Sequence, residues 1–116
     1  MNAALSADEL AHYHEHGYVF PRYRLPDPLL QRLRESLDRV LTTYTDVAQE
    51  DLANPHMLPP TSGAQMNPFM AAARHPVVLD MMEQIIGPDI MLWISGILGS
   101  PPDKGREVSC HQDGKC

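Results

Sequence analysis

The residues with the clearest chemical potential are a histidine and a carboxylate near the C-terminal end of the chain. His111 and Asp113 lie in the run Cys110-His111-Gln112-Asp113-Gly114. If Val108 to Asp113 is extended, the alternation of side chains along a strand puts His111 and Asp113 on one face and Cys110 and Gln112 on the other. An imidazole nitrogen and a carboxylate oxygen then converge on one point, where both are suited to bind a metal ion.

A histidine and a carboxylate at this spacing supply two of the three ligands of the 2-His-1-carboxylate facial triad. That triad holds Fe(II) and leaves positions open for a co-substrate and O2. Two other interpretations fit the same residues. Asp113-Gly114 is typical of a hairpin turn, with His111 as an ordinary strand residue. Cys110, His111, Asp113 and Cys116 are also all zinc ligand types, although a strand points Cys110 and His111 to opposite faces.

Composition narrows the class of protein. The 116 residues, 43% of them hydrophobic, correspond to one domain or part of one. A net charge of −6 without a run of lysine or arginine argues against nucleic-acid and anionic membrane partners. The longest apolar stretch, Ile90 to Leu98, is too short to span a bilayer, and no signal-peptide pattern opens the chain. We therefore expect a cytoplasmic protein with reduced cysteines.

The first helix has clear boundary signals. Ser6 and Glu9 form a capping box, which predicts a helix over Ala7 to His16, and Gly17 is a typical residue just past a helix C-terminus. The β-branched and aromatic residues of Tyr18 to Phe20 then predict a short strand.

This predicted helix carries a second pair of metal-ligand types. His12 and His16 lie four residues apart and so share one face of the helix, where two imidazoles could bind one metal ion. A solvated histidine face is the commoner arrangement, and no carboxylate completes a preorganised site.

Further helices are predicted in the middle of the chain. Asp27-Pro28 is a start signal for about twenty residues, Asn67-Pro68 opens another helix, and His75-Pro76 interrupts and restarts it up to Gly87-Pro88. A stripe of apolar residues at helical spacing marks the core face of the first of these: Leu30, Leu33, Leu37, Val40, Leu41, Tyr44 and Val47.

The remaining segments predict a loop and two strands. Between Gln49 and Asn67 prolines accumulate and periodicity is lost, which indicates either a site-lining loop or a plain connection. Ile90 to Ile94 predicts a strand covered on both faces, and Glu107 to Asp113 a second strand after the turn at Pro101 to Gly105.

Several short segments of this sequence are individually common, but their order and spacing along the chain are together specific. They are the first helix running into His16-Gly17-Tyr18-Val19-Phe20, the helix end at Ile85 to Ile90, the Pro101-Pro102 turn, and the run from Gly105 to Gly114. With these pieces the whole chain resembles the N-terminal part of the phytanoyl-CoA dioxygenase family of Fe(II)- and 2-oxoglutarate-dependent oxygenases.

The resemblance implies a fold and an activity. The fold is α+β, with N-terminal helices over 1–88 and the first strands of a double-stranded β-helix, or jelly roll, over 89–116 of a single domain. His111 and Asp113 would bind Fe(II), with 2-oxoglutarate and O2 as co-substrates and Ser100 and Gln112 as expected contacts of 2-oxoglutarate. A small organic or acyl substrate would be hydroxylated, because halogenating relatives have a small residue in place of Asp113.

Two departures from the family pattern bear on activity. Many members have a lysine before the proline turn, where this chain has Gly99-Ser100; a serine hydroxyl donates a hydrogen bond but carries no charge. The distal histidine and the basic residue that grips 2-oxoglutarate are expected beyond Cys116. We therefore expect this polypeptide to be truncated and inactive as written. The alternative is a small self-contained protein that binds zinc or a partner. A third interpretation is a non-catalytic relative that keeps the helices of the fold.

Overall fold

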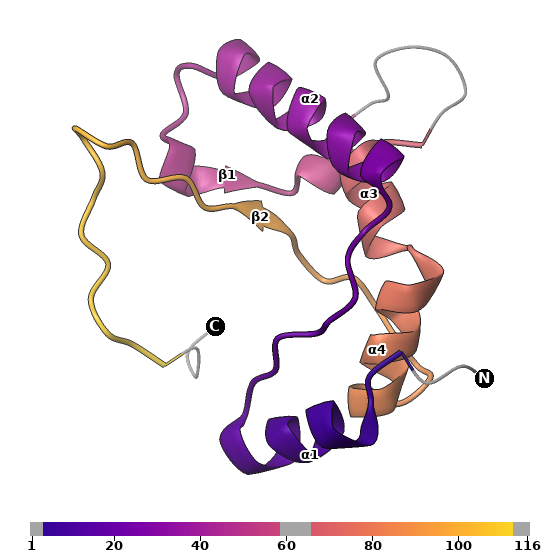
Figure 1. Cartoon of the computed structure of the whole chain (residues 1–116). Coiled ribbons are helices and arrows are strands. Elements are labelled where there is room, and N and C mark those ends of the chain that lie inside the picture. The colour runs from indigo at the N-terminus through magenta and orange to yellow at the C-terminus, as the bar shows by residue number, and fades with distance from the viewer. Residues whose placement is uncertain (1–3, 59–65, 113–116) are drawn as a thin grey trace.

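The computed structural model describes residues 4–58 and 66–112, which form a mixed arrangement of helices and one small antiparallel sheet (Figure 1). This agrees with the expected α+β class. The elements, in chain order, are α1 (Ala7–His16), α2 (Asp27–Thr43), a 3-10 turn (Gln49–Asp51), β1 (Leu52–Ala53), a second 3-10 turn (Pro55–Met57), α3 (Pro68–Ala73), α4 (Pro76–Ile86) and β2 (Gly96–Ile97).

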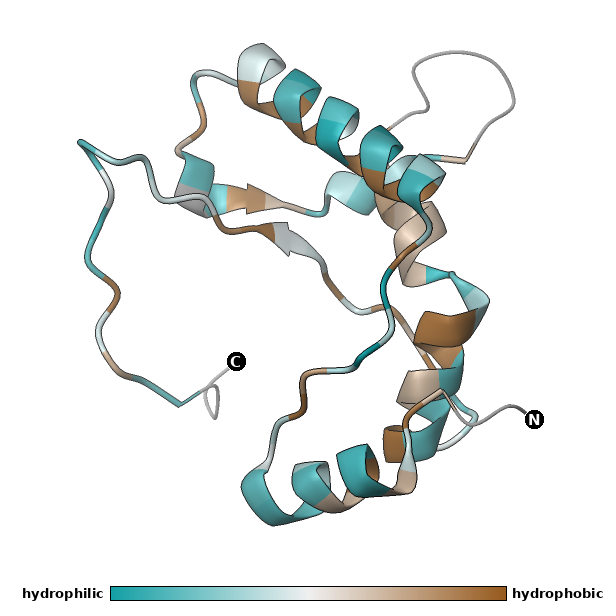
Figure 2. Cartoon of the chain, viewed as in Figure 1, coloured by the Kyte–Doolittle hydropathy of each residue, from teal (hydrophilic) through white to brown (hydrophobic). Residues whose placement is uncertain are grey.

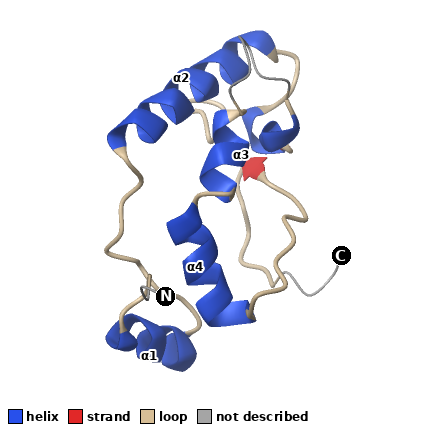
Figure 3. Ribbon diagram, turned by 90° about the vertical axis from the view of Figure 1, so that its right-hand side faces the viewer, coloured by secondary structure: helices blue, strands red, loops and turns tan. Residues whose placement is uncertain are grey.

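These elements are arranged in an open shape. Figure 1 shows α2 and the sheet at one end and α1 beside the end of α4 at the other, and Figure 3 shows α3 and α4 as the column between them. The radius of gyration is 16.3 Å, whereas a compact domain of this length has about 13 Å. Much apolar surface therefore stays uncovered: among the described residues only Leu5, Val40 and Met81 are fully buried hydrophobic side chains.

Both predicted ends of α1 are confirmed. The Ser6 amide donates to Glu9 Oε2 at 2.8 Å, and the Glu9 amide donates to Ser6 Oγ at 3.2 Å. At the other end Gly17 adopts φ +80°, which favours glycine, and its amide donates to the Tyr13 carbonyl. These contacts satisfy backbone groups that a helix end leaves without partners.

Glu9 also fastens the segment after α1. Its Oε1 accepts the backbone N–H of Arg22 at 2.9 Å, so one carboxylate holds two stretches of backbone. The hydrogen bond from the Ser6 backbone N–H stabilises the charged carboxylate most, and the one from the Arg22 backbone N–H is second. Both lower the pKa of Glu9.

The N-terminal segment is joined to α4 by a reciprocal pair of hydrogen bonds. Leu5 N–H donates to Gln84 Oε1 at 2.8 Å, and Gln84 Nε2 donates to the Leu5 carbonyl at 3.0 Å. The Leu5 side chain is 1% exposed, the most deeply buried of the described residues. The amide of Gln84 therefore acts like a strand neighbour for Leu5 across 79 positions of sequence.

Helix α2 is shorter than the apolar stripe predicts. It ends at Thr43, and the last two apolar residues of the stripe, Tyr44 and Val47, are exposed. Its N-cap is Pro26, one residue earlier than expected. The apolar side of α2 faces α3 and the sheet, as the hydropathy colours of Figure 2 show. Val40 on this side is buried.

The predicted starts of α3 and α4 are confirmed. Asn67 Oδ1 accepts from the Phe69 amide, and His75 Nδ1 accepts from the Val77 amide. Asn67 is buried and also donates through Nδ2 to the carbonyls of Pro55 and Leu58. One cap residue thus anchors the preceding loop on α3.

The sheet lies where no strand was predicted. β1 falls inside the expected loop and pairs antiparallel with β2, with Leu52 opposite Ile97 and Ala53 opposite Gly96. The Asn54 amide donates to the Ser95 carbonyl at 2.8 Å, which continues the pairing. Two residues are too short a run to carry a strand pattern, which is why the sequence did not predict β1.

The predicted strands at Tyr18–Phe20, Ile90–Ile94 and Glu107–Asp113 are wrong for the residues that the structure describes, since none of these forms a ladder there. A strand needs a neighbour to satisfy its backbone. No backbone hydrogen bond between described residues involves 90–94, and Trp93 is 85% exposed. In the described part of the chain the β structure is therefore one two-stranded sheet.

No helix of the described residues is long and apolar enough to cross a bilayer.

Replacing Gln84 tests the junction between the N-terminal segment and α4. Gln84→Ala removes both partners of the Leu5 backbone, whose side chain is buried, and should lower the free energy of unfolding by about 1–3 kcal/mol. Denaturant unfolding measures this change. The matched control is Gln31→Ala, because exposed Gln31 on α2 bonds only to Glu35. Equal losses in the two variants would contradict the proposed role of Gln84.

The lowered pKa of Glu9 makes the free energy of unfolding depend on pH under acidic conditions. Because folding lowers the pKa of Glu9, its contribution is present above the ordinary pKa of a glutamate, about 4.3, and is lost as the pH falls through the lowered value. We expect the unfolding midpoint of Glu9→Gln to fall less steeply than that of the wild type below about pH 4.3. Glu15→Gln, at the other end of α1, is the control and should keep the wild-type slope.

Candidate functional site

The segment that carries the predicted ligands leaves the sheet through a tight turn. The Gly105 amide donates to the Pro101 carbonyl at 3.0 Å, which confirms the predicted turn at Pro101 to Gly105. A Cβ on Gly105 would lie 3.0 Å from the Pro101 carbonyl and would overlap the Ser100 hydroxyl. Position 105 therefore requires glycine because of this close approach.

An ion pair holds the start of this segment against the loop before β1. Arg106 Nη2 lies 2.7 Å from Asp51 Oδ1, and both side chains are more than half exposed. A pair this exposed contributes about 0–1 kcal/mol to stability. Its importance is positional, because it brings residues 106–111 beside residue 51; Figure 1 shows the segment running free of the helices beyond this point.

His111 lies along this segment and lines an open hollow of about 400 Å³. Its side chain is exposed, and Nδ1 lies 2.9 Å from the Ser109 carbonyl oxygen. A carbonyl only accepts, so Nδ1 carries the proton and Nε2 carries the ring lone pair. This is the tautomer in which a histidine binds a metal through Nε2 while a second hydrogen bond fixes the ring.

The lining of the hollow does not follow the alternation predicted for a strand. The hollow is lined by Asp51, Arg106, Glu107, Val108, Ser109 and His111. Four of these are consecutive, residues 106–109, while Cys110 and Gln112 do not line it. Asp113, the second predicted ligand, lies outside the described residues.

The other predicted site residues are not gathered at this hollow. Ser100 is exposed, with its hydroxyl packed against Gly105 in the turn, and Gln112 is exposed at the end of the described segment. Cys110 is an exposed free thiol, and Cys116 lies outside the described residues. Within residues 4–58 and 66–112, no three His, Cys, Asp or Glu side chains come close enough to hold a metal ion.

The structure adds two residues to the candidate site. Arg106 and Asp51 line the same hollow as His111, and the sequence analysis assigned neither of them a role. Arg106 lies within the run from Gly105 to Gly114 that resembles the oxygenase family, so the sequence offered a signal for it. Asp51 carried no signal, because only the pairing of β1 with β2 brings it near. The described part of the predicted loop thus does line the site.

A larger hollow of about 550 Å³ lies elsewhere, between the starts of α2 and α4. Its polar groups are occupied in joining elements of the fold. Arg32 Nη2 donates to the Met66 carbonyl at 2.7 Å, and His75 caps α4 through Nδ1 while its Nε2 lies 3.4 Å from the Tyr23 hydroxyl. These contacts account for the geometry of the junction without a ligand.

Comparison with known proteins shows a distant similarity to a dioxygenase. The chain is 24% identical over 123 residues to human peroxisomal phytanoyl-CoA dioxygenase, an alignment that covers 95% of this chain and 36% of that protein. No family model and no solved structure matches the chain. The similarity supports a distant relationship to that dioxygenase, of which this chain spans about a third of the length.

Gly105 and Gly96 offer a matched test of the turn that leads to His111. Gly105→Ala should strain the turn, loosen the Arg106–Asp51 pair and speed hydrogen exchange of the residue 105 amide by about tenfold or more, because its Cβ meets a backbone oxygen. Gly96→Ala should be tolerated, since its nearest neighbour, the Leu52 oxygen, lies at an ordinary 3.8 Å. Unchanged exchange in Gly105→Ala would contradict this account of the turn.

Proposed function

We propose that this chain forms the N-terminal part of an Fe(II)- and 2-oxoglutarate-dependent dioxygenase domain of jelly-roll type. In this proposal residues 1–88 form the helical part and residues 89–116 contribute the first core strands. His111 and Asp113 are two of the iron ligands. The third ligand and the basic residue that binds the far carboxylate of 2-oxoglutarate belong to the remaining two thirds of a protein of the relative's length.

The observation that carries the proposal is the hydrogen bond between His111 Nδ1 and the Ser109 carbonyl. In the neutral ring it leaves the lone pair on Nε2, one of the two nitrogens through which a histidine can bind a metal, and it restrains the ring. The exposure of His111 at an open hollow gives a metal and its co-substrate access. The distant relationship to a dioxygenase supports the identity of the metal as iron.

The chain's own residues have separate roles in this proposal. His111 and Asp113 hold the metal on one face of the segment, and the Arg106–Asp51 pair fixes where that segment begins. Ser100 and Gln112 are proposed contacts of 2-oxoglutarate, Ser100 as a hydroxyl donor. When bound, iron and 2-oxoglutarate supply the chemistry, in which O2 converts 2-oxoglutarate to succinate and CO2 while the substrate gains a hydroxyl group.

The substrate class in this proposal is a small organic or acyl molecule. The relative's name specifies phytanoyl-CoA, which is an acyl thioester. A carboxylate at position 113 supports hydroxylation as the outcome, because it completes the set of protein ligands around the metal.

We propose the cytoplasm as the location of this protein, while the human relative is named as peroxisomal. Microscopy of the intact protein, fluorescently labelled at its N-terminus, distinguishes the two compartments.

Removing either proposed ligand should abolish turnover. In the intact enzyme domain that contains this chain, His111→Ala and Asp113→Ala should each lower Fe(II)-dependent succinate formation by about a hundredfold or more, since loss of even an outer-shell group costs 10–100-fold. Cys110→Ser, between them in sequence but on the other face, is the control and should stay within about twofold. Full turnover in Asp113→Ala would reject the ligand assignment.

A further inference from the structure

A second site with metal-ligand side chains lies on α1, which contributes no residue to the lining of the His111 hollow. His12 and His16 are one helical turn apart, and their ring centroids are 4.4 Å apart with the ring planes inclined at 45°. His12 is half-buried and His16 is exposed, so the two rings meet at the edge of the helix surface. The inclination of the ring planes excludes parallel stacking as the reason for the separation.

The centroid separation matches two imidazoles on adjacent positions of one metal ion. With a metal–nitrogen bond of about 2.0–2.1 Å and about 1.1 Å from nitrogen to ring centre, each centroid lies about 3.2 Å from the metal. If the two metal–nitrogen bonds meet at a right angle, the ring centroids are about 4.5 Å apart. If they meet at the tetrahedral angle, the centroids are about 5.2 Å apart. The observed 4.4 Å fits the right angle of square-planar and octahedral metals.

The backbone that carries the pair is firmly held. The capping box of Ser6 and Glu9 fixes the start of α1, and Gly17 closes its end directly after His16. Tyr18 packs edge-on against the His12 ring, with centroids 5.0 Å apart and planes at 84°. The two rings are therefore restrained before a metal binds, which lowers the entropy lost on binding.

The charge around the pair favours a cation. Glu15 Oε2 lies 3.7 Å from His16 Nε2, and the carboxylates of Asp8 and Glu9 stand in the first turn of the same ten-residue helix. Among the described residues Glu15 does not join the two histidines in a group of three ligands, but its carboxylate can accept a hydrogen bond from metal-bound water.

We propose that His12 and His16 form a binding site for a divalent transition metal of the Ni(II) or Cu(II) class. The two imidazoles occupy adjacent coordination positions and water completes the shell. The site is independent of the iron site proposed at His111, and it cross-links the last turn and a half of α1.

The test is Ni(II) titration by calorimetry of the untagged 116-residue chain carrying His111→Ala, which separates this site from the proposed iron site. We expect one Ni(II) per chain. Adding His12→Ala or His16→Ala should weaken binding by at least about tenfold, the change expected when one of two protein ligands is lost. Alanine favours helix, so lost binding in these variants is not explained by loss of α1.

The matched control is His14→Ala, because His14 is on the same helix but outside the His12–His16 face. It should keep Ni(II) affinity within about twofold. Equal weakening in His14→Ala, or undiminished binding in His12→Ala, would overturn the site. Substoichiometric Cu(II) should also broaden the imidazole NMR signals of His12 and His16 before that of His14, and the reverse order would contradict the assignment.

Discussion

The pairing of β1 with β2 is the constraint on which the candidate site depends. The register that sets Leu52 opposite Ile97 brings the loop after α2 beside the segment after α4. The contact continues outward on both sides, through Asn54 with Ser95 and through Gly99 with Gln49. Only because of this pairing does Asp51 meet Arg106, and only because of that ion pair does the extended segment start beside the hollow that His111 lines.

The same structure leaves much apolar surface without cover. Met91, Trp93, Leu98 and Val108 are all more than three quarters exposed, and they belong to the two stretches on either side of the Pro101 turn. Apolar exposure on this scale marks a surface that contacts something other than water. In the proposed jelly roll these stretches are the first core strands, so the rest of the domain would supply both the missing ladder partners and the cover.

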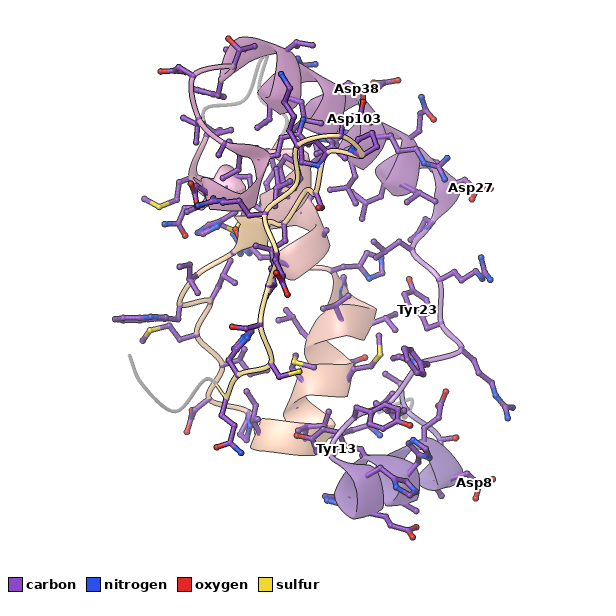
Figure 4. The ribbon with its side chains drawn as sticks, turned by 90° about the vertical axis from the view of Figure 1, so that its left-hand side faces the viewer. Asp8, Tyr13, Tyr23, Asp27, Asp38 and Asp103 are labelled. Atoms are coloured by element: carbon purple, nitrogen blue, oxygen red, sulfur yellow. The ribbon has the colours of Figure 1, made fainter. Side chains whose placement is uncertain are left out.

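The two histidine sites differ in how their geometry is set. On α1 the helix itself spaces His12 and His16, caps at both ends hold that helix, and neighbouring aromatic rings restrain the side chains. At His111 the hydrogen bond to the Ser109 carbonyl orders the ring on a segment that is not part of the sheet. Figure 4 shows α1, with Asp8 and Tyr13, at one end of the molecule and Asp38 and Asp103 at the other. No residue of α1 lines the hollow at His111, so the two proposed sites share no side chain.

The sequence by itself determined the features that arise from neighbours along the chain. The capping box at Ser6, the glycine stop at Gly17 and the starts at Asn67 and His75 were all predictable, because each depends on groups within about four residues. Tertiary structure alone decided which extended segments became strands, since a ladder needs a partner from a distant part of the chain. It likewise decided the Leu5–Gln84 junction and the meeting of Asp51 with Arg106, contacts that join residues more than fifty positions apart and leave no local pattern.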